Sequence, residues 1–221
     1  MNTVDNPRTQ DNRNYIYNES MSSSRSEYKF IADLIEPGSK VIDLGCGDGA
    51  LLELLIKRKN VRGKGLEISQ SGVELCKKKH LDVMQGEIDA LLPYNDSEFD
   101  YSICNVTIQM VKYPEVLLKE MQRISKYQVI SFPNFGYFKN RVELLFKGKM
   151  PGKMLFGYKW YNTGHIHQLS VKDFYDLLND VENFKIIEKI TIPSGSKLID
   201  FLAGIFPGMF GKIILFRVTG C

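Results

Sequence analysis

One stretch of sequence decides the fold of this chain: Val41-Ile42-Asp43-Leu44-Gly45-Cys46-Gly47-Asp48-Gly49-Ala50-Leu51-Leu52. An apolar run carries an acid near its end, three glycines follow at every second position, and a helical pattern begins at once. This order predicts a buried strand, a tight turn and a helix. Glycine suits such a turn because it allows unusual backbone dihedrals and lets a ligand approach closely. The amides that open the helix would then face whatever occupies the turn.

The rest of the chain repeats the alternation of strand and helix. Apolar runs predict strands at 40–44, 64–68, 82–85, 99–105, 127–132, 184–192 and 212–219. Helical spacing predicts helices at 28–35, 50–59, 71–79, 115–124, 136–150 and 170–178. Five nearly continuous apolar strands indicate a parallel sheet with helices on both faces. The sequence therefore predicts a Rossmann-like α/β fold with a mostly parallel, seven-stranded sheet.

The end of the chain has a different rhythm. No helical pattern of comparable length separates the last two strands, so we expect an antiparallel hairpin at the sheet edge. The apolar segment 198–210 is expected to pack over that edge, and any part of it that is exposed would make a partner-binding surface. Residues 1–24 are polar and are predicted to form a flexible arm. Residues 25–221 are predicted to form a single domain, with an aromatic lid or insert at about 136–168.

Composition limits the partners that we expect. The formal net charge is +3 and spread out, which argues against a nucleic-acid partner. The lysine run at 77–79 is interpreted as a solvated helix end. The four cysteines show no metal-ligand spacing, and no signal peptide is visible, so we expect a cytoplasmic protein without a metal site. The longest apolar tract, 201–216, is too broken to span a bilayer, so no membrane partner is expected.

The spacing of the glycine turn narrows the nucleotide. It is Asp-x-Gly-x-Gly-x-Gly, which differs from the dinucleotide pattern and lacks the Gly-Lys-Ser/Thr needed to grip a triphosphate. Glu67 ends the next strand about 20 residues later, where an acid can bind ribose hydroxyls. A plain surface acid at a strand end is the alternative interpretation of Glu67.

Together these residues resemble the class I S-adenosylmethionine-dependent methyltransferases. The resemblance implies S-adenosylmethionine as cofactor and S-adenosylhomocysteine as product. It implies that the methionyl part lies in the turn, which is formed by Asp43, Gly45, Cys46, Gly47 and Gly49. Cys46 itself is interpreted as a small space-filling residue rather than a reactive thiol.

The same resemblance assigns the rest of the cofactor site. It implies that Glu67 holds the ribose beside Ile68, and that Gly86-Glu87-Ile88 flanks the adenine. Glu87 and Asp89 are both candidates for the acid that reaches the adenine amine. Asn105, at the end of the fourth strand, would lie near the transferred methyl group.

A second set of residues resembles the MetW family of methionine biosynthesis proteins. These are the runs Ser131-Phe132-Pro133-Asn134-Phe135-Gly136, Trp160-Tyr161-Asn162-Thr163 and His165-Ile166-His167, together with 41–49 and 99–101. The family's usual pattern is Trp-Tyr-Asp-Thr-Pro-Asn-Ile-His, so Asn162 replaces an acid and Gly164-His165 replaces Pro-Asn. The resemblance implies a link to methionine biosynthesis alongside a homoserine O-acyltransferase, but no known methyl acceptor.

Two histidines are the candidate catalytic bases, because an imidazole titrates near neutral pH. His165 and His167 are two residues apart, and at most one of them is expected to point into a pocket. We favour His167, which matches the family position, and a structural histidine is the equal alternative. Asn134, Tyr158, Trp160 and Tyr161 are predicted to line the acceptor pocket, although the aromatic residues also suit a core or an interface.

Two functions follow from these residues. The first is a methyltransferase that acts on a small-molecule acceptor. The second is a regulatory subunit that binds S-adenosylmethionine and acts by contacting a homoserine O-acyltransferase. Nucleic-acid methylation is disfavoured, because the fourth strand lacks an Asn-Pro-Pro-Tyr-like run for a flipped base.

Overall fold

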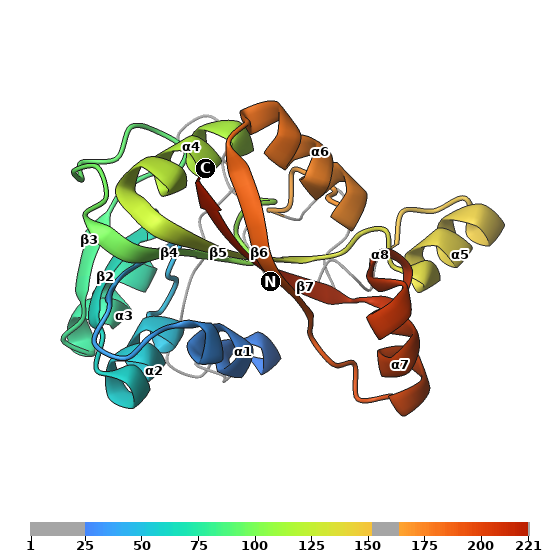
Figure 1. Cartoon of the computed structure of the whole chain (residues 1–221), viewed down its shortest axis with the longest axis horizontal. Coiled ribbons are helices and arrows are strands. Elements are labelled where there is room, and N and C mark those ends of the chain that lie inside the picture. The colour runs from blue at the N-terminus through green and yellow to red at the C-terminus, as the bar shows by residue number, and fades with distance from the viewer. Residues whose placement is uncertain (1–24, 152–163, 221) are drawn as a thin grey trace.

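The computed structural model of the chain describes residues 25–151 and 164–220. The predicted N-terminal arm and the aromatic residues Tyr158, Trp160 and Tyr161 lie outside these ranges. The described residues form one layered α/β arrangement, with a central sheet and helices on both sides (Figure 1).

The central sheet has seven strands in the order β3-β2-β1-β4-β5-β7-β6. The strands are β1 (Lys40–Leu44), β2 (Arg62–Glu67), β3 (Asp82–Gln85), β4 (Phe99–Asn105), β5 (Ser125–Pro133), β6 (Phe184–Thr191) and β7 (Ile213–Gly220). The first five are parallel, whereas β7 is antiparallel to both β5 and β6. The predicted mostly parallel sheet with an antiparallel C-terminal pair is therefore confirmed.

Helices cover both faces of this sheet, as the sequence predicts. They are α1 (Ser26–Leu34), α2 (Ala50–Lys59), α3 (Gln70–Lys78), α4 (Pro114–Ile124), α5 (Phe138–Lys147), α6 (Val171–Val181), α7 (Lys197–Ile205) and α8 (Pro207–Phe210). One apolar core joins Ile42 of β1 to α4 and α6, and the other joins Val41 to α1 and α2. Successive residues of β1 thus enter opposite cores, which is the period-two alternation of a strand that is buried on both sides.

The connection between the last two strands differs from the prediction. It contains two helices, α7 and α8, rather than a segment without a helical pattern. The expectation that 198–210 packs over the sheet edge is also wrong for most of its side chains. Ala203 is buried against the body, whereas the side chain of Phe201 is 66% exposed. Only one face of a helix can pack against the sheet, and the apolar residues of this segment extend beyond that face.

Other differences are shifts of boundaries. The strand predicted at 64–68 begins earlier and ends on Glu67, and the helix predicted at 136–150 is shorter at both ends. The shorter helix ends because Gly148 adopts a left-handed conformation with φ of 58°. None of the helices within the described ranges has the length and apolar content that a bilayer crossing requires.

Candidate functional site

The glycine turn lies between the carboxyl end of β1 and the start of α2. Gly45, Gly47 and Gly49 have φ of 78°, 59° and 75°, values that side chains with a Cβ rarely adopt. The amides of Gly45 and Cys46 both donate to the carbonyl oxygen of Leu66, at 2.7 and 3.2 Å, which fastens the turn to β2. The sequence-predicted turn is thus formed, and its backbone conformation explains the choice of glycine.

Space also requires glycine at two of these positions. A Cβ on Gly45 would lie 2.6 Å from the Cγ2 atom of Thr107, and one on Gly49 would collide with Leu81 and Cys76. The contact with Thr107 was missed by the sequence reasoning, because that residue follows β4 and nothing local to it points to the turn. The loops after β1 and β4 therefore close on each other at the site.

Two buried carboxyl groups lie beneath the turn. Asp43 is 2% and Glu67 is 3% exposed. Glu67 accepts hydrogen bonds from the amides of Gly47 and Ser69, each at 2.8 Å. Burial, and after it the neighbouring charge of Glu67, raise the pKa of Asp43 to about 7. Asp43 therefore changes its charge near neutral pH, whereas Glu67 holds the turn through the amide of Gly47 and the start of α3 through the amide of Ser69.

Residues in and just after α3 form hydrogen bonds to the glycine turn. The ammonium group of Lys79 donates to the carbonyl oxygen of Asp48 at 2.8 Å and to its carboxylate at 3.2 Å. The interpretation of the lysine run as a wholly solvated end is therefore wrong for Lys79. The thiol of Cys76 donates to the carbonyl oxygen of Gly47 at 3.4 Å.

Cys46 is packed inside the site rather than presented to solvent. Its hydrogen bond with Cys76 and its burial both raise the pKa of its thiol well above the usual range. Its sulfur lies 2.8 Å from the point that a Cβ on Gly65 would occupy. A protonated, enclosed thiol is a weak nucleophile, so these properties fit a space-filling role.

Glu87 and Asp89, the two candidates for the acid that reaches the adenine amine, both lie in the segment that follows β3. The carboxylate of Asp89 accepts from the amides of Lys112 and Tyr113, at 2.7 and 3.1 Å, and is buried. Glu87 is exposed beside the buried Ile88. Ile68 is half-buried, and its carbonyl oxygen accepts from the side chain of Gln85 at 3.1 Å. Asp89 thus orders the next loop, while Glu87 faces outward at the strand end.

The residues after β4 adopt a strained backbone. Val106 has φ of 57°, which is an outlier for a β-branched residue. Its amide donates to the carbonyl oxygen of Ser131 at 3.0 Å, and the Ser131 hydroxyl donates to the side-chain oxygen of Asn105 at 2.6 Å. Strain of this kind persists where the surroundings fix it, and it concentrates at functional sites. Asn105 is therefore held in one orientation beside the turn.

The two candidate histidines have different surroundings. His165 is 8% exposed, and burial lowers the pKa of its imidazole. His167 is exposed, and its backbone amide donates to the carbonyl oxygen of Gln109 at 3.0 Å. The two histidines therefore differ in exposure, although residues two apart in a regular extended strand would share a face. The structure buries His165 rather than the favoured His167.

Asn134 takes part in the framework of the molecule. It is fully buried, and its amide nitrogen donates to the carbonyl oxygens of Gly208 and Gly211 at 3.0 and 2.9 Å. Its side-chain oxygen accepts from the amide of Gly136 at 3.0 Å. Asn134 thus ties α8 to the end of β5. Within the described ranges, no three His, Cys, Asp or Glu side chains gather as a metal ion would require.

Comparison with known families matches the chain to the model described as methionine biosynthesis protein MetW, over residues 25–218. The chain belongs to the MetW family. A curated relative of this MetW-family chain is the bifunctional methionine biosynthesis protein MetXA/MetW of Rhodopirellula baltica, 34% identical over 172 residues. That match covers 72% of the chain but only 27% of the longer relative.

Two further similarities extend beyond the MetW family. A demethylmenaquinone methyltransferase of Staphylococcus carnosus is 26% identical over 73% of the chain and 74% of its own length. A solved S-adenosylmethionine-dependent methyltransferase from Thermotoga maritima superposes with a TM-score of 0.61 at 22% identity, covering 88% of the chain and 87% of that structure. The fold is therefore the class I methyltransferase fold that the sequence predicts.

Proposed function

We propose that this chain binds S-adenosylmethionine at the glycine turn and transfers its methyl group to a small-molecule acceptor. The observation that carries the proposal is the turn itself, in which three glycines with positive φ lie above the carboxyl groups of Asp43 and Glu67. Membership of the MetW family and the similarity to a demethylmenaquinone methyltransferase support it. We also propose a role in methionine biosynthesis, and a cytoplasmic location that suits the free cysteines Cys46, Cys76 and Cys104.

The residues around the turn suit the parts of the cofactor. Gly45, Cys46, Gly47 and Gly49 would bound the methionyl part, with Asp43 beneath its positive charges. Glu67 would accept from the ribose hydroxyls, because a carboxylate has about four lone-pair directions and can also hold the turn. Ile68 and Ile88 would flank the adenine, and the exposed carboxylate of Glu87 would accept from its amine. Asn105, held by Ser131, would lie near the methyl group.

Methyl transfer does not require the protein to form a covalent intermediate. S-adenosylmethionine supplies an activated methyl group, so the chain's own residues orient the acceptor and exclude water. An oxygen or nitrogen acceptor also needs a base that is unprotonated at the working pH. Burial lowers the pKa of the His165 imidazole and so favours its unprotonated form, which makes it the better candidate. His167 remains the alternative, because it is exposed and at the family position.

Calorimetry tests the cofactor site. Glu87→Ala should weaken S-adenosylmethionine binding about tenfold without changing stability, because Glu87 is exposed. Asp180→Ala, at an exposed acid on the distant α6, is the matched control and should bind as the wild type does. Failure of the wild type to bind the cofactor would overturn the proposal.

Transfer is tested separately with methyl-labelled cofactor and a metabolite extract. A labelled product that disappears in His165→Asn and persists in His167→Asn assigns the base to His165. The reverse result assigns it to His167. An absence of any labelled product, despite tight cofactor binding, would contradict methyl transfer.

A second function is favoured by a specific observation, the joining of MetXA and MetW in one relative. We propose, as the alternative, that the chain binds a homoserine O-acyltransferase and regulates it in response to S-adenosylmethionine. The two proteins should then co-purify, and the cofactor should change the acyltransferase rate. An unchanged rate in the presence of the chain and the cofactor would contradict this role.

A further inference from the structure

The helices that follow β5 and β6 expose an unusual number of large apolar side chains. The most exposed include Leu145 and Phe146 of α5, Leu198, Phe201 and Ile205 of α7, and Phe206 at the start of α8. Only Asn140 of α5 and Ala203 of α7 are buried. Figure 1 shows α5 projecting beyond the end of β5, with α7 and α8 at the same end of the molecule. We call the exposed sides of these three helices the apolar helix surface.

This surface is fastened to the body of the protein. The rings of Phe138 on α5 and Phe210 on α8 pack with their centroids 5.3 Å apart. Asn134 holds α8 through two carbonyl oxygens and also binds the amide of Gly136, just before α5. The exposed apolar side chains are therefore presented by anchored helices, and large exposed patches on an ordered framework mark interaction sites.

The charge around α5 restricts what can cover the surface. Residues 138–150 contain Lys139, Arg141, Lys147 and Lys149 but only one acid, Glu143, which gives this segment a formal charge of +3. In a two-fold symmetric dimer that used this surface, the positively charged segment 138–150 of one copy would lie against or near the same segment of the other copy. Like charges would then oppose association. The favoured occupant has an apolar centre and an acidic edge.

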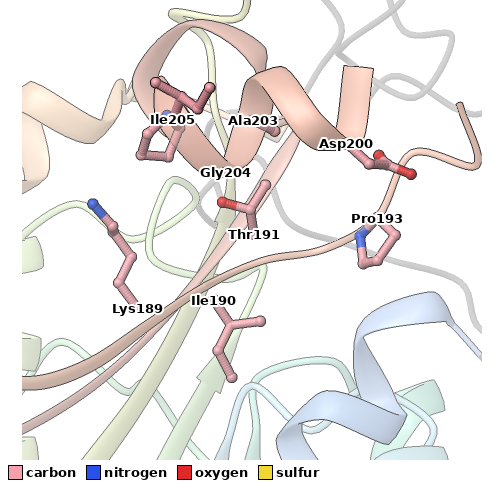
Figure 2. A pocket seen from close by; sticks show the side chains of 9 residues that line it. Lys189, Ile190, Thr191, Pro193, Asp200, Ala203, Gly204 and Ile205 are labelled. Carbon is pink, nitrogen blue, oxygen red and sulfur yellow. The ribbon is translucent and has the colours of Figure 1, made fainter. Parts of the chain in front are cut away.

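A cleft beside the surface favours a protein over a lipid layer. Figure 2 shows it between β6 and α7, with Lys189 and Thr191 on one side and Asp200 and Ile205 on the other. Its volume is about 480 Å³, enough for a large side chain. Protein interfaces concentrate their affinity where an anchor side chain fills such a pocket. A membrane surface presents no projecting group of that kind.

We propose that the apolar helix surface and this cleft are the docking site for the homoserine O-acyltransferase. The inference rests on the second function proposed above, whose support is the fused relative, and it assigns the contact to α5, α7 and α8. The acyltransferase would present apolar side chains to Phe146 and Phe201, acidic groups to Lys147 and Lys149, and one anchor side chain to the cleft.

The test measures binding of the source organism's homoserine O-acyltransferase to the full-length chain. Phe146→Asp and Phe201→Asp should each weaken the complex at least tenfold, because they place a charge in a desolvated contact. Leu91→Asp changes an 83% exposed apolar residue between β3 and β4 and should leave the affinity unchanged. Lys147→Glu should weaken binding less and reduce its dependence on salt.

Cofactor binding and assembly state separate the possible failures. All four variants should bind S-adenosylmethionine as the wild type does, which shows that they are folded. A wild type that binds no acyltransferase overturns both the partner function and this inference. Equal affinities of wild type, Phe146→Asp and Phe201→Asp overturn the surface assignment alone. Phe146→Asp and Phe201→Asp could instead abolish self-association, or binding to vesicles of anionic phospholipid, and leave acyltransferase binding unchanged. That result also overturns the surface assignment.

Discussion

The burial of side chains differs between two regions of the molecule. One region is the carboxyl ends of β1 and β2, and the other is the set of helices after β5. At the glycine turn, polar groups are buried and bonded, as Glu67 is to two backbone amides. On α5 and α7, apolar groups such as Phe146 are left in water. The comparison teaches that the polar groups at the glycine turn find their partners within one chain, whereas the large apolar side chains of α5 and α7 are left uncovered by the described residues.

The largest effect should come from filling the turn. Gly45→Ala places a Cβ against Thr107 at a positive φ, so we expect a loss of about 3 kcal/mol in the free energy of unfolding. S-adenosylmethionine affinity should fall at least a hundredfold in calorimetry. Gly38→Ala is the matched control, because Gly38 also has positive φ but open space around it. It should cost about 1–2 kcal/mol and leave cofactor binding intact.

The next effect concerns pH and the buried carboxyl group. The pKa of Asp43 is raised by burial to about 7 from an ordinary value of 3.8. The folded state thus holds a proton that the unfolded state has released, so stability is lost as pH rises toward 7. Between pH 5 and 7.5 this loss should be about 2.5 kcal/mol and should be absent in Asp43→Asn. Urea unfolding of both proteins across this range measures it, and parallel pH curves would contradict it.

A smaller effect should come from the residue that ties α8 to the end of β5. Asn134→Ala leaves the carbonyl oxygens of Gly208 and Gly211 without their donor, so we expect a loss of about 2 kcal/mol. Hydrogen exchange should also accelerate at the amide of Gly211, which closes α8. Exchange that accelerates equally in β1 would show a global loss instead of a local release of α8.

The smallest effect should come from the exposed helices. Phe146→Ser should change the free energy of unfolding of the isolated chain by less than about 0.5 kcal/mol, because the side chain is already in water. Phe132→Ala, at a fully buried ring, should cost about 3–5 kcal/mol in the same chemical denaturation experiment. A large cost at Phe146 would mean that the chain itself covers this residue.

The sequence predicted what local patterns encode. Alternating glycines and apolar strands determined the turn and the parallel sheet, because both depend on neighbouring residues. Contacts between distant segments were not visible, so the roles of Lys79, Thr107 and Asp89 in the turn and its loops were missed. The helices α7 and α8 were missed because Pro207 and three glycines interrupt an apolar run. The relative burial of His165 and His167 depends on the loop that they pack against, which no spacing rule supplies.

The position of β7 has a consequence for how the chain is made. It is the last strand in sequence order, yet it lies between β5 and β6 and pairs with both. On a ribosome, the first five strands can associate as they emerge, since each strand after β1 pairs with a neighbour made earlier. β6 has no partner in the sheet until β7 follows it. Synthesis therefore passes through a stage in which the growing chain carries a parallel five-stranded sheet, an unpaired strand edge at β5 and a β6 that has no partner yet.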